Sequence, residues 1–288
     1  MKVRQQVRPR RALAAAGLAL AVGVALVGCG SDSPASSSTT PVGDASVAPT
    51  GTATPDDLAG ELTIFAAASL EPVLDEIATA FTAEHPAVSF APITYDGSST
   101  LATQLSEGAH ADVFASADLK NMQTVVDAGL VVDDSRVFTT NTLQIVVPAG
   151  NPDGIRSLAD LATLADDGGK VVLCAVEVPC GAASQRVLDA AGVTLTPASF
   201  EQNVTAVLTK VTAGEADAGL VYRTDVLKTG DAVQGIDFVE SGDAVNEYPM
   251  ATLTDATDVE LADAFIDFVL SDAGQALLDA RGFTAVTA

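Results

Sequence analysis

Four turns in this sequence place small residues where a predicted strand runs into a predicted helix. They contain Ser69, then Ser98 with Ser99, then Cys180, and finally Asn203. A helix start exposes backbone N–H groups and the positive end of the helix dipole, so it binds anions without a charged side chain. Taken singly, each serine is better explained as an ordinary N-cap. Their recurrence at four junctions favours a shared anion pocket.

The elements that must position these turns alternate along the chain. Apolar runs predict strands at 61–68, 88–93, 112–116, 143–148, 171–176 and 218–222. Helical periodicity, such as Val73, Ile77 and Phe81, predicts helices at 70–84, 100–107, 119–128, 158–164, 182–191, 204–213, 259–270 and 273–280. This alternation is typical of an α/β fold with mainly parallel sheets.

Composition restricts the possible partners. The 288 residues carry 14 basic and 38 acidic side chains, a net charge of −24. Residues 1–28 hold five of the basic residues and no acid, so the remainder is near −29. Such a chain lacks the basic patches that nucleic acid and anionic lipid require, so we expect no nucleic-acid partner. With 48% hydrophobic residues it has enough apolar side chains for a folded core.

The first residues resemble a bacterial lipoprotein signal. Residues 1–11 are basic, 12–27 are apolar, and the run ends in Leu26-Val27-Gly28-Cys29. We expect removal of residues 1–28, a lipid on Cys29, and a flexible Ser/Thr/Pro-rich linker over 29–57. An uncleaved membrane anchor is the alternative, although the apolar run is marginal for spanning a bilayer. Arg10-Arg11 leaves Sec and twin-arginine export both open.

Two further cysteines, Cys174 and Cys180, are separated by five residues. Because an exported domain meets an oxidising environment, the pair predicts a disulfide. A metal site is the alternative, but no cluster of cysteine and histidine accompanies the pair, since His85 and His110 lie far away in the sequence.

Several blocks occur in the order found in one family. They are Phe65-Ala-Ala-Ala-Ser69-Leu70, Gly97-Ser-Ser-Thr-Leu-Ala-Thr-Gln104, 108–118, Glu177-Val-Pro-Cys-Gly181, Gly219-Leu-Val-Tyr222, Glu247-Tyr-Pro249, 265–275 and Arg281-Gly-Phe283. Together they resemble the signatures of the periplasmic molybdate-binding proteins of ABC importers. The resemblance covers essentially residues 60–284, and it is the combination of blocks that is specific.

The resemblance implies a two-lobed type II periplasmic-binding-protein fold that closes on a tetrahedral oxyanion. Lobe I would comprise 58–140 with 245–288, and lobe II 141–244, with two crossover segments as the hinge. The expected protein is an exported monomer, held to the outer face of the cell membrane through Cys29. It would deliver molybdate, and tungstate as well, to an ABC permease and its ATPase.

The ligand set implied by the resemblance falls on the same turns. Ser69 and Ser98 would donate hydroxyl and backbone N–H groups, Cys180 and Val204 backbone N–H groups, and Tyr222 its phenol. No other cofactor is implied, and molybdenum would be held only as bound molybdate. Cys180 stands where the family commonly has alanine. This is harmless if its sulfur is tied to Cys174, whereas a free thiol facing the pocket would be open to oxidation.

A second departure is Gly97, which replaces a frequent serine and removes one hydroxyl. Lys and Arg are absent from the four turns, and Arg223 is the nearest in sequence. Neutral, fixed donors select an anion by size and geometry. This favours molybdate and tungstate over phosphate and sulfate, and sulfate or another tetrahedral oxyanion stays the alternative.

Other function classes fit less well. An enzyme of the lipoprotein hydrolase kind needs a Gly-x-Ser-x-Gly elbow or a Ser/His/acid set, and the glycine pattern around Ser98 does not match. Ferric-ion binders use neighbouring tyrosines, whereas Tyr95, Tyr222 and Tyr248 are scattered in the sequence. Amino-acid binders need an arginine in the turns. We therefore expect a binding protein and not an enzyme.

Overall fold

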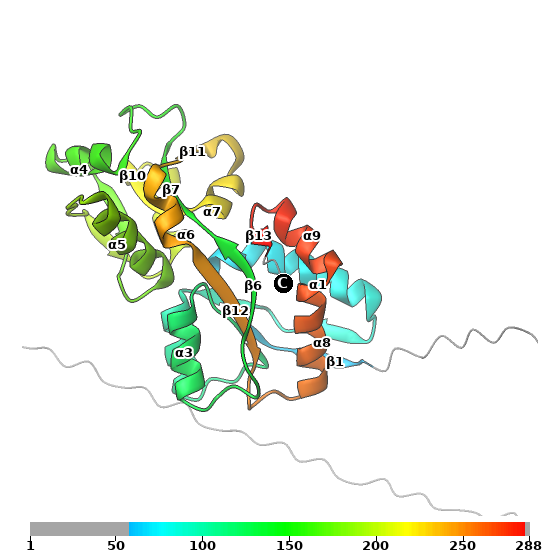
Figure 1. Ribbon diagram of the computed structural model, residues 1–288. Coiled ribbons are helices and arrows are strands. Elements are labelled where there is room, and N and C mark those ends of the chain that lie inside the picture. Colours follow the sequence, from blue (N-terminus) through cyan, green and yellow to red (C-terminus); the bar gives the residue numbers. More distant parts are fainter. Residues whose placement is uncertain (1–57, 286–288) are drawn as a thin grey trace, which may run out of the picture. The chain divides into compact units, whose positions relative to one another are not determined.

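The computed structural model describes residues 58–285, which contain two lobes (Figure 1). The expected signal segment 1–28, the lipidated Cys29 and the linker 29–57 lie outside the described residues. Among the described residues, no helix combines the length and the apolar character needed to cross a membrane.

Lobe I is built on a six-stranded sheet in the order β13-β6-β12-β5-β2-β4. Its strands are β2 (Ile64–Ala67), β4 (Thr94–Asp96), β5 (Val113–Ala115), β6 (Arg136–Asn141), β12 (Asn246–Thr252) and β13 (Thr284–Ala285), and β1 (Gly60–Leu62) pairs separately with β3 (Val88–Phe90). Its helices are α1 (Glu71–Glu84), α2 (Ser98–Ser106), α3 (Leu119–Asp127), α8 (Val259–Leu270) and α9 (Asp272–Ala280), with a 3-10 turn η1 (Ala68–Leu70) before α1.

Lobe II is built on a five-stranded sheet in the order β11-β7-β10-β8-β9. Its strands are β7 (Leu143–Pro148), β8 (Val171–Cys174), β9 (Ser199–Glu201), β10 (Ala218–Tyr222) and β11 (Val233–Ile236). Its helices are α4 (Leu158–Asp166), α5 (Pro179–Ala191), α6 (Val204–Thr212) and α7 (Arg223–Leu227), with 3-10 turns η2 (Gly230–Ala232) and η3 (Val239–Ala244).

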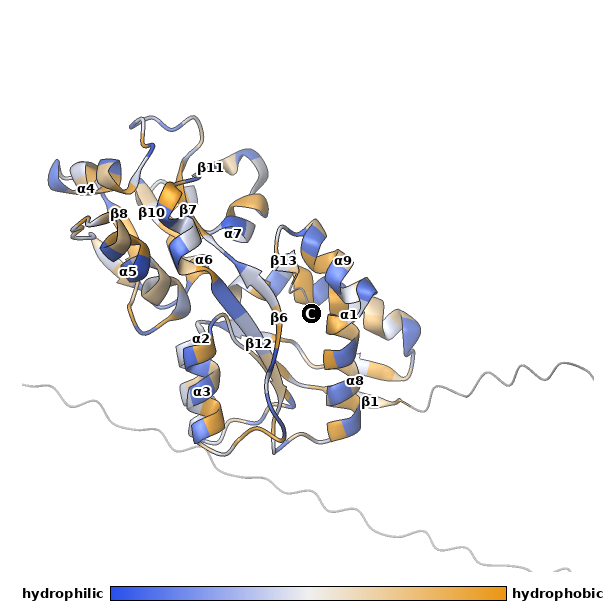
Figure 2. Ribbon diagram, in the orientation of Figure 1, coloured by the Kyte–Doolittle hydropathy of each residue, from blue (hydrophilic) through white to orange (hydrophobic). Residues whose placement is uncertain are grey.

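Each lobe has its own core, and the strand pattern explains how lobe I is covered on both faces. Successive residues of β2 point to opposite faces, so Ile64 and Ala66 pack with α1 and α8, whereas Phe65 packs with α2 and α3. Helices such as α3 and α8 accordingly carry hydrophobic residues along one side and hydrophilic residues along the other (Figure 2).

The two-lobed α/β architecture is confirmed, but the expectation of mainly parallel sheets is wrong. Within residues 58–285 the antiparallel strand pairings are as numerous as the parallel ones. The reason is the way the chain passes between the lobes. β6 leads out of lobe I, β12 returns to it, and the two strands pair antiparallel with each other (Figure 1).

The sequence pattern missed both crossing strands, β6 and β12. Their sequences, Arg-Val-Phe-Thr-Thr-Asn and Asn-Glu-Tyr-Pro-Met-Ala-Thr, carry many polar residues. Pro249 also argues against a central strand, and the structure accommodates it at a register shift between Tyr248 and Pro249. The short elements β4, β9, β11 and α7 were missed as well, and the strand expected at 61–68 is interrupted at Thr63, whose N–H donates to Asp112 (2.6 Å).

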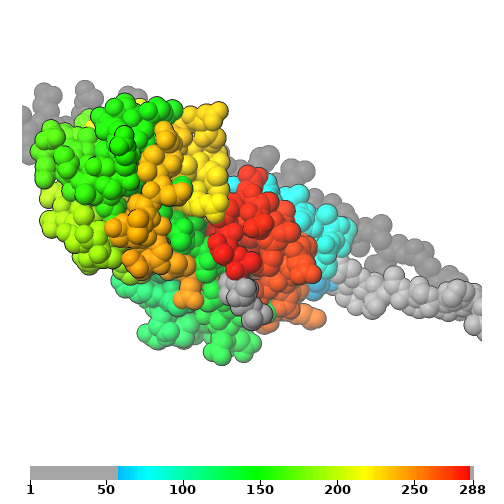
Figure 3. Space-filling view, turned by 45° about the horizontal axis from the view of Figure 1, so that its top comes forward, coloured from blue at the N-terminus to red at the C-terminus, as the bar shows by residue number. Residues whose placement is uncertain are grey.

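The lobes also meet away from the crossing strands. Arg223 Nη1 in lobe II donates to the carbonyl of Gly282 in lobe I (3.4 Å). Gly282 also packs closely against Leu227 of lobe II, because a Cβ atom added to this glycine would lie 2.3 Å from Leu227 Cδ1. Figure 3 shows this contact between the yellow residues of α7 and the red residues at the end of α9.

Candidate functional site

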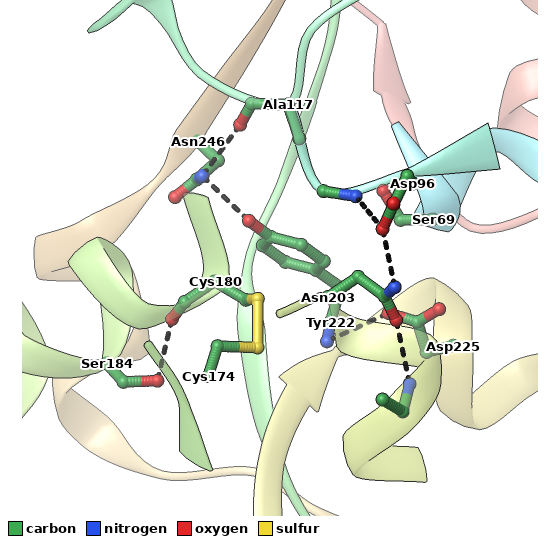
Figure 4. Close-up of a disulfide and its surroundings, with 12 residues drawn as sticks. Ser69, Asp96, Ala117, Cys174, Cys180, Ser184, Asn203, Tyr222, Asp225 and Asn246 are labelled. Atoms are coloured by element: carbon green, nitrogen blue, oxygen red, sulfur yellow. Dashed lines mark hydrogen bonds between the residues drawn. A yellow bond between two sulfur atoms is a disulfide. The ribbon is translucent and has the colours of Figure 1, made fainter. Parts of the chain in front are cut away.

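A small cavity of about 10 Å³ lies between the lobes, at the ends of strands where helices begin. Its lining from lobe I is Ala67, Ala68, Ser69, Asp96, Gly97, Ser98 and Ala117, and from lobe II Val178, Pro179, Cys180, Asn203, Val204 and Tyr222. The five residues that the sequence suggested for an oxyanion, Ser69, Ser98, Cys180, Val204 and Tyr222, therefore all lie around one cavity. Figure 4 shows several of them.

Helix starts supply much of this lining. α2 begins at Ser98, α5 at Pro179 and α6 at Val204, so their first turns present N–H groups that have no partner within the helix. Asn203 is the N-cap of α6, and its Oδ1 accepts from Ala206 N (2.9 Å). Asn203 thus has the ordinary capping role that the sequence suggested for the serines.

The two serines, in contrast, do not act as N-caps. Ser98 is the first residue of α2 rather than its cap, and its Oγ accepts from Ala117 N at 2.9 Å. Ser69 lies within η1, and its Oγ is 3.0 Å from the Tyr248 hydroxyl. Both side chains are buried at the cavity wall, Ser98 with an exposed fraction of 0% and Ser69 with 3%. Because neither hydroxyl is used for capping, both remain available to a ligand.

Tyr222 is held by an asparagine that contacts both lobes. Asn246 Nδ2 donates to the Tyr222 hydroxyl oxygen (2.9 Å) and to the carbonyl of Ala117 (2.8 Å), as Figure 4 shows. Arg186 Nη2 donates to Asn246 Oδ1 (3.0 Å), which fixes the orientation of the amide because only its oxygen can accept. The Tyr222 oxygen thus accepts a hydrogen bond from Asn246, and Tyr222 lines the cavity.

A second asparagine acts on Ser69 through Tyr248. Asn141 Nδ2 donates to Thr224 Oγ1 (2.9 Å) and to the Tyr248 hydroxyl oxygen (3.4 Å). In the bond between Ser69 and Tyr248 either hydroxyl can be the donor, and Asn141 acts on Ser69 by holding the Tyr248 hydroxyl in place. Ser69, Ser98 and Tyr222 therefore share one property: each hydroxyl is held beside the cavity by a hydrogen bond with another protein group.

Both tyrosines stay protonated at neutral pH. Burial, followed by the nearby Tyr248 and Asp118, raises the pKa of Tyr222 well above its usual value. Burial likewise raises the pKa of Tyr248. The expectation that the tyrosines are scattered is wrong for this pair, whose ring centroids lie 5.9 Å apart. Raised pKa values nevertheless oppose the phenolate form that a ferric ion would need.

Asp96 is the one charged residue in the cavity lining of the described structure. Its Oδ1 accepts from Gly97 N and from Asn203 Nδ2, each at 2.7 Å. Lysine and arginine are absent from the lining, and Arg223 points to Gly282 instead. The cavity therefore offers neutral donors, with one carboxylate oxygen that already has two partners.

The predicted disulfide between Cys174 and Cys180 is present in the structure (Figure 4). Both cysteines are buried, with Cα atoms 5.7 Å apart, and the bond ties the end of β8 to the first turn of α5. The sulfur of Cys180 is thus not a free thiol at the cavity, and the backbone N–H is what this residue can present. In residues 58–285, no group of three or more His, Cys, Asp or Glu side chains is placed to hold a metal ion.

The sequence pattern that defines the bacterial extracellular solute-binding proteins matches residues 62–284. The chain belongs to this family. Its members are exported solute-binding proteins of ABC transporters and not enzymes, as we expected from the sequence. One relative, the molybdate-binding protein ModA of Mycobacterium tuberculosis, is 45% identical over 268 residues, covering 93% of this chain and 96% of that protein.

Solved structures of other solute-binding proteins share the fold. The periplasmic molybdate-binding protein of Azotobacter vinelandii superposes with a TM-score of 0.67 at 17% identity, covering 78% of this chain and all of that one. The sulfate-binding protein SubI of Mycobacterium tuberculosis gives 0.66 at 21% identity, covering 78% and 87%. These likenesses confirm the type II periplasmic-binding-protein fold, and at such identities they do not discriminate between ligands.

Sequence reasoning missed three residues that orient the donors of this solute-binding protein. Asn141 and Asn246 gave no local signal, because each acts on a tyrosine that is distant in sequence or in another element. Tyr248 lay inside the quoted block Glu247-Tyr-Pro249, but only the fold shows its contact with Ser69.

We predict that peptide mapping will find the disulfide closed. Cleavage after Lys170 and Arg186 releases residues 171–186 with both cysteines. Without reductant this peptide should resist alkylation and lack two hydrogen atoms relative to its reduced form. After reduction it should take up two alkyl groups. Quantitative alkylation of denatured, unreduced protein would contradict the structure.

Proposed function

We propose that this solute-binding protein captures molybdate, and tungstate as well, and delivers it to an ABC permease driven by its ATPase. The observation that carries the proposal is that neutral hydrogen-bond donors line the cavity. The hydroxyls of Ser69, Ser98 and Tyr222 line it, and the oxygens of Ser98 and Tyr222 already accept hydrogen bonds from Ala117 N and Asn246 Nδ2. A ligand that fits these groups accepts hydrogen bonds from several directions and carries no proton of its own.

A tetrahedral oxyanion fits the arrangement of these donors. Serine hydroxyls approach from lobe I, while the α5 and α6 starts and the Tyr222 phenol approach from lobe II, so oxygens on all sides of a central atom find partners. Hydrogen bonds to a charged acceptor contribute about 1.5–3 kcal/mol each. Several of them offset the cost of removing a dianion from water without a basic side chain.

Phosphate fits less well because at neutral pH it carries a proton that needs an acceptor. Within the described lining the carboxylate of Asp96 is the charged acceptor, and its Oδ1 already receives two hydrogen bonds. Sulfate also lacks a proton and is therefore the second candidate. The 45% identity with a molybdate-binding protein favours the larger anion.

Delivery requires the protein to stay near the permease. We propose that Cys29 carries the lipid, that residues 29–57 form the linker, and that the monomeric protein works at the outer face of the membrane. We propose that two rigid bodies move relative to each other. One comprises residues 58–140 with 245–288, the other residues 141–244, and the chain bends at Asn141-Thr142 and at Val245-Asn246. Closure around the anion would create the surface that the permease recognises.

We predict that calorimetric titration of the protein will show saturable binding of molybdate and tungstate, and binding of sulfate and phosphate that is at least about tenfold weaker, or ~1.4 kcal/mol. Equal or tighter binding of sulfate would contradict the ligand assignment and favour the second candidate. No binding by any of the four anions would contradict an oxyanion function altogether.

A second prediction concerns Ser98. Ser98→Ala removes one donor to a charged acceptor, so molybdate affinity should fall by about 1.5–3 kcal/mol, roughly ten- to 150-fold. Ser106→Ala is the matched control, because Ser106 lies at the other end of α2 and donates only to the carbonyl of Ala102 (2.8 Å). Equal affinities for the two variants would show that Ser98 is not a ligand residue.

The third prediction concerns pH. The donor form of Tyr222 is the neutral phenol, and its raised pKa keeps that form populated to above pH ~10. Molybdate affinity should therefore be nearly constant from about pH 6 to 9 in calorimetric titrations. A steep loss within this range would reveal a titrating group at the site. Tyr222→Phe, the comparison variant, should bind more weakly but with the same flat profile.

A further inference from the structure

Two backbone turns meet across the cavity at its edge. In lobe I, Asp96 ends β4 and Gly97 precedes α2. In lobe II, Gln202 and Asn203 lie between β9 and α6. Asn203 Nδ2 donates to Asp96 Oδ1 at 2.7 Å, which is a direct hydrogen bond between the lobes (Figure 4). This contact uses a different pair of side chains from the proposed ligand donors.

Each partner in this bond is oriented by its own lobe. Gly97 N donates to Asp96 Oδ1 (2.7 Å), so the carboxylate is fixed within lobe I. Asn203 Oδ1 accepts from Ala206 N (2.9 Å), so the amide must turn its Nδ2 away from α6 and toward Asp96. The bond therefore needs no rearrangement inside either lobe when the lobes approach.

Gly97 determines how closely the turns can approach. A Cβ at this position would lie 2.2 Å from the carbonyl oxygen of Gln202 and 3.2 Å from Val178 Cγ1, both in lobe II. The backbone of Gly97 has φ −61°, which any residue adopts, so glycine is not required by the local conformation. It is required by the other lobe. The sequence suggested only that Gly97 removes a hydroxyl, but its steric role is larger.

We propose that Asp96, Gly97 and Asn203 form a latch that sets the distance at which the lobes stop, and hence the radius of the cavity. The latch makes these residues specificity determinants, because a cavity of fixed radius accepts one size of tetrahedral anion best. The specificity part rests on the proposed function, whereas the closure part does not. The carboxylate of Asp96 lies beside the proposed anion site because it holds the opposite lobe, by accepting the hydrogen bond from Asn203.

The decisive variant is Asn203→Asp. The new carboxylate still offers an oxygen to cap Ala206 N, but it replaces the donor that faces Asp96 by a second negative charge, which repels the first. Adding Asp96→Asn removes the repulsion, and the amide introduced at position 96 can donate to the carboxylate introduced at position 203; this bond replaces the one from Gly97 N, because both existing bonds end on the same oxygen, Asp96 Oδ1. The single variant should lower molybdate affinity at least about tenfold, and the double variant should recover most of it.

Gly97→Ala tests the steric part, with Gly242→Ala as its matched control. Gly242 also lacks a positive φ, and a Cβ there meets nothing within 4 Å. Gly97→Ala should weaken molybdate binding at least about tenfold and change the ratio of molybdate to sulfate affinity, whereas Gly242→Ala should change neither. Thermal unfolding of each ligand-free variant verifies that the lobes stay folded.

Small-angle scattering separates the latch from the proposed function. The latch would also hold a fraction of the ligand-free molecules closed, so without ligand Asn203→Asp and Gly97→Ala should have a larger radius of gyration than the wild type and Gly242→Ala. If the wild type binds none of the four anions, the proposed function fails, and the radii alone decide the latch. A double variant as weak as Asn203→Asp, or equal radii and affinities for Gly97→Ala and Gly242→Ala, would overturn the proposal.

Discussion

The orientation of two asparagine amides is the constraint on which the rest of this structure depends. Asn141 and Asn246 are register partners on β6 and β12, at the points where the chain leaves and re-enters lobe I. Each donates to a tyrosine oxygen, Tyr248 and Tyr222 respectively. The residues that join the lobes are therefore the same residues that hold the hydroxyls of Tyr248 and Tyr222 in place. A change in the angle between the lobes would disturb the donors directly.

This coupling supports our proposal that an acidic protein binds an anion here. With a net charge of −24 for the whole chain, the long-range field opposes an approaching dianion, although salt screens it beyond roughly 8 Å at physiological ionic strength. Attraction must then come from dipoles at contact distance. Dipoles are effective only when they are fixed in advance, since turning them toward the ligand would use part of the binding energy. Arg186, Ala117 N and the two asparagines hold them fixed.

The sequence was sufficient to find the turns but not the contacts between them. Strand-to-helix junctions are local patterns, and because strand ends gather at one edge of each sheet, Ser69, Ser98, Cys180, Val204 and Tyr222 meet at one cavity. The crossing strands β6 and β12 escaped detection because their polar residues serve the hinge and the site rather than a core. Asn246 and Tyr248 lie in β12. Hydrophobic alternation and β-propensity can predict a strand, but they do not indicate which distant residues its side chains hydrogen-bond to. Non-local hydrogen bonds of this kind need the fold.

The disulfide shows how lobe II keeps its half of the site rigid. Cys174 ends β8 and Cys180 opens α5, so the bond holds the helix start against the strand that precedes it. A Cβ at Gly181 would lie 1.8 Å from the carbonyl oxygen of Ala175, which shows how tightly this turn is packed. In lobe I the Ser98–Ala117 bond has the same effect on the start of α2. Since both halves are fixed internally, the closure that we propose would take place at the two crossings, and the cavity radius would depend on where the lobes come to rest.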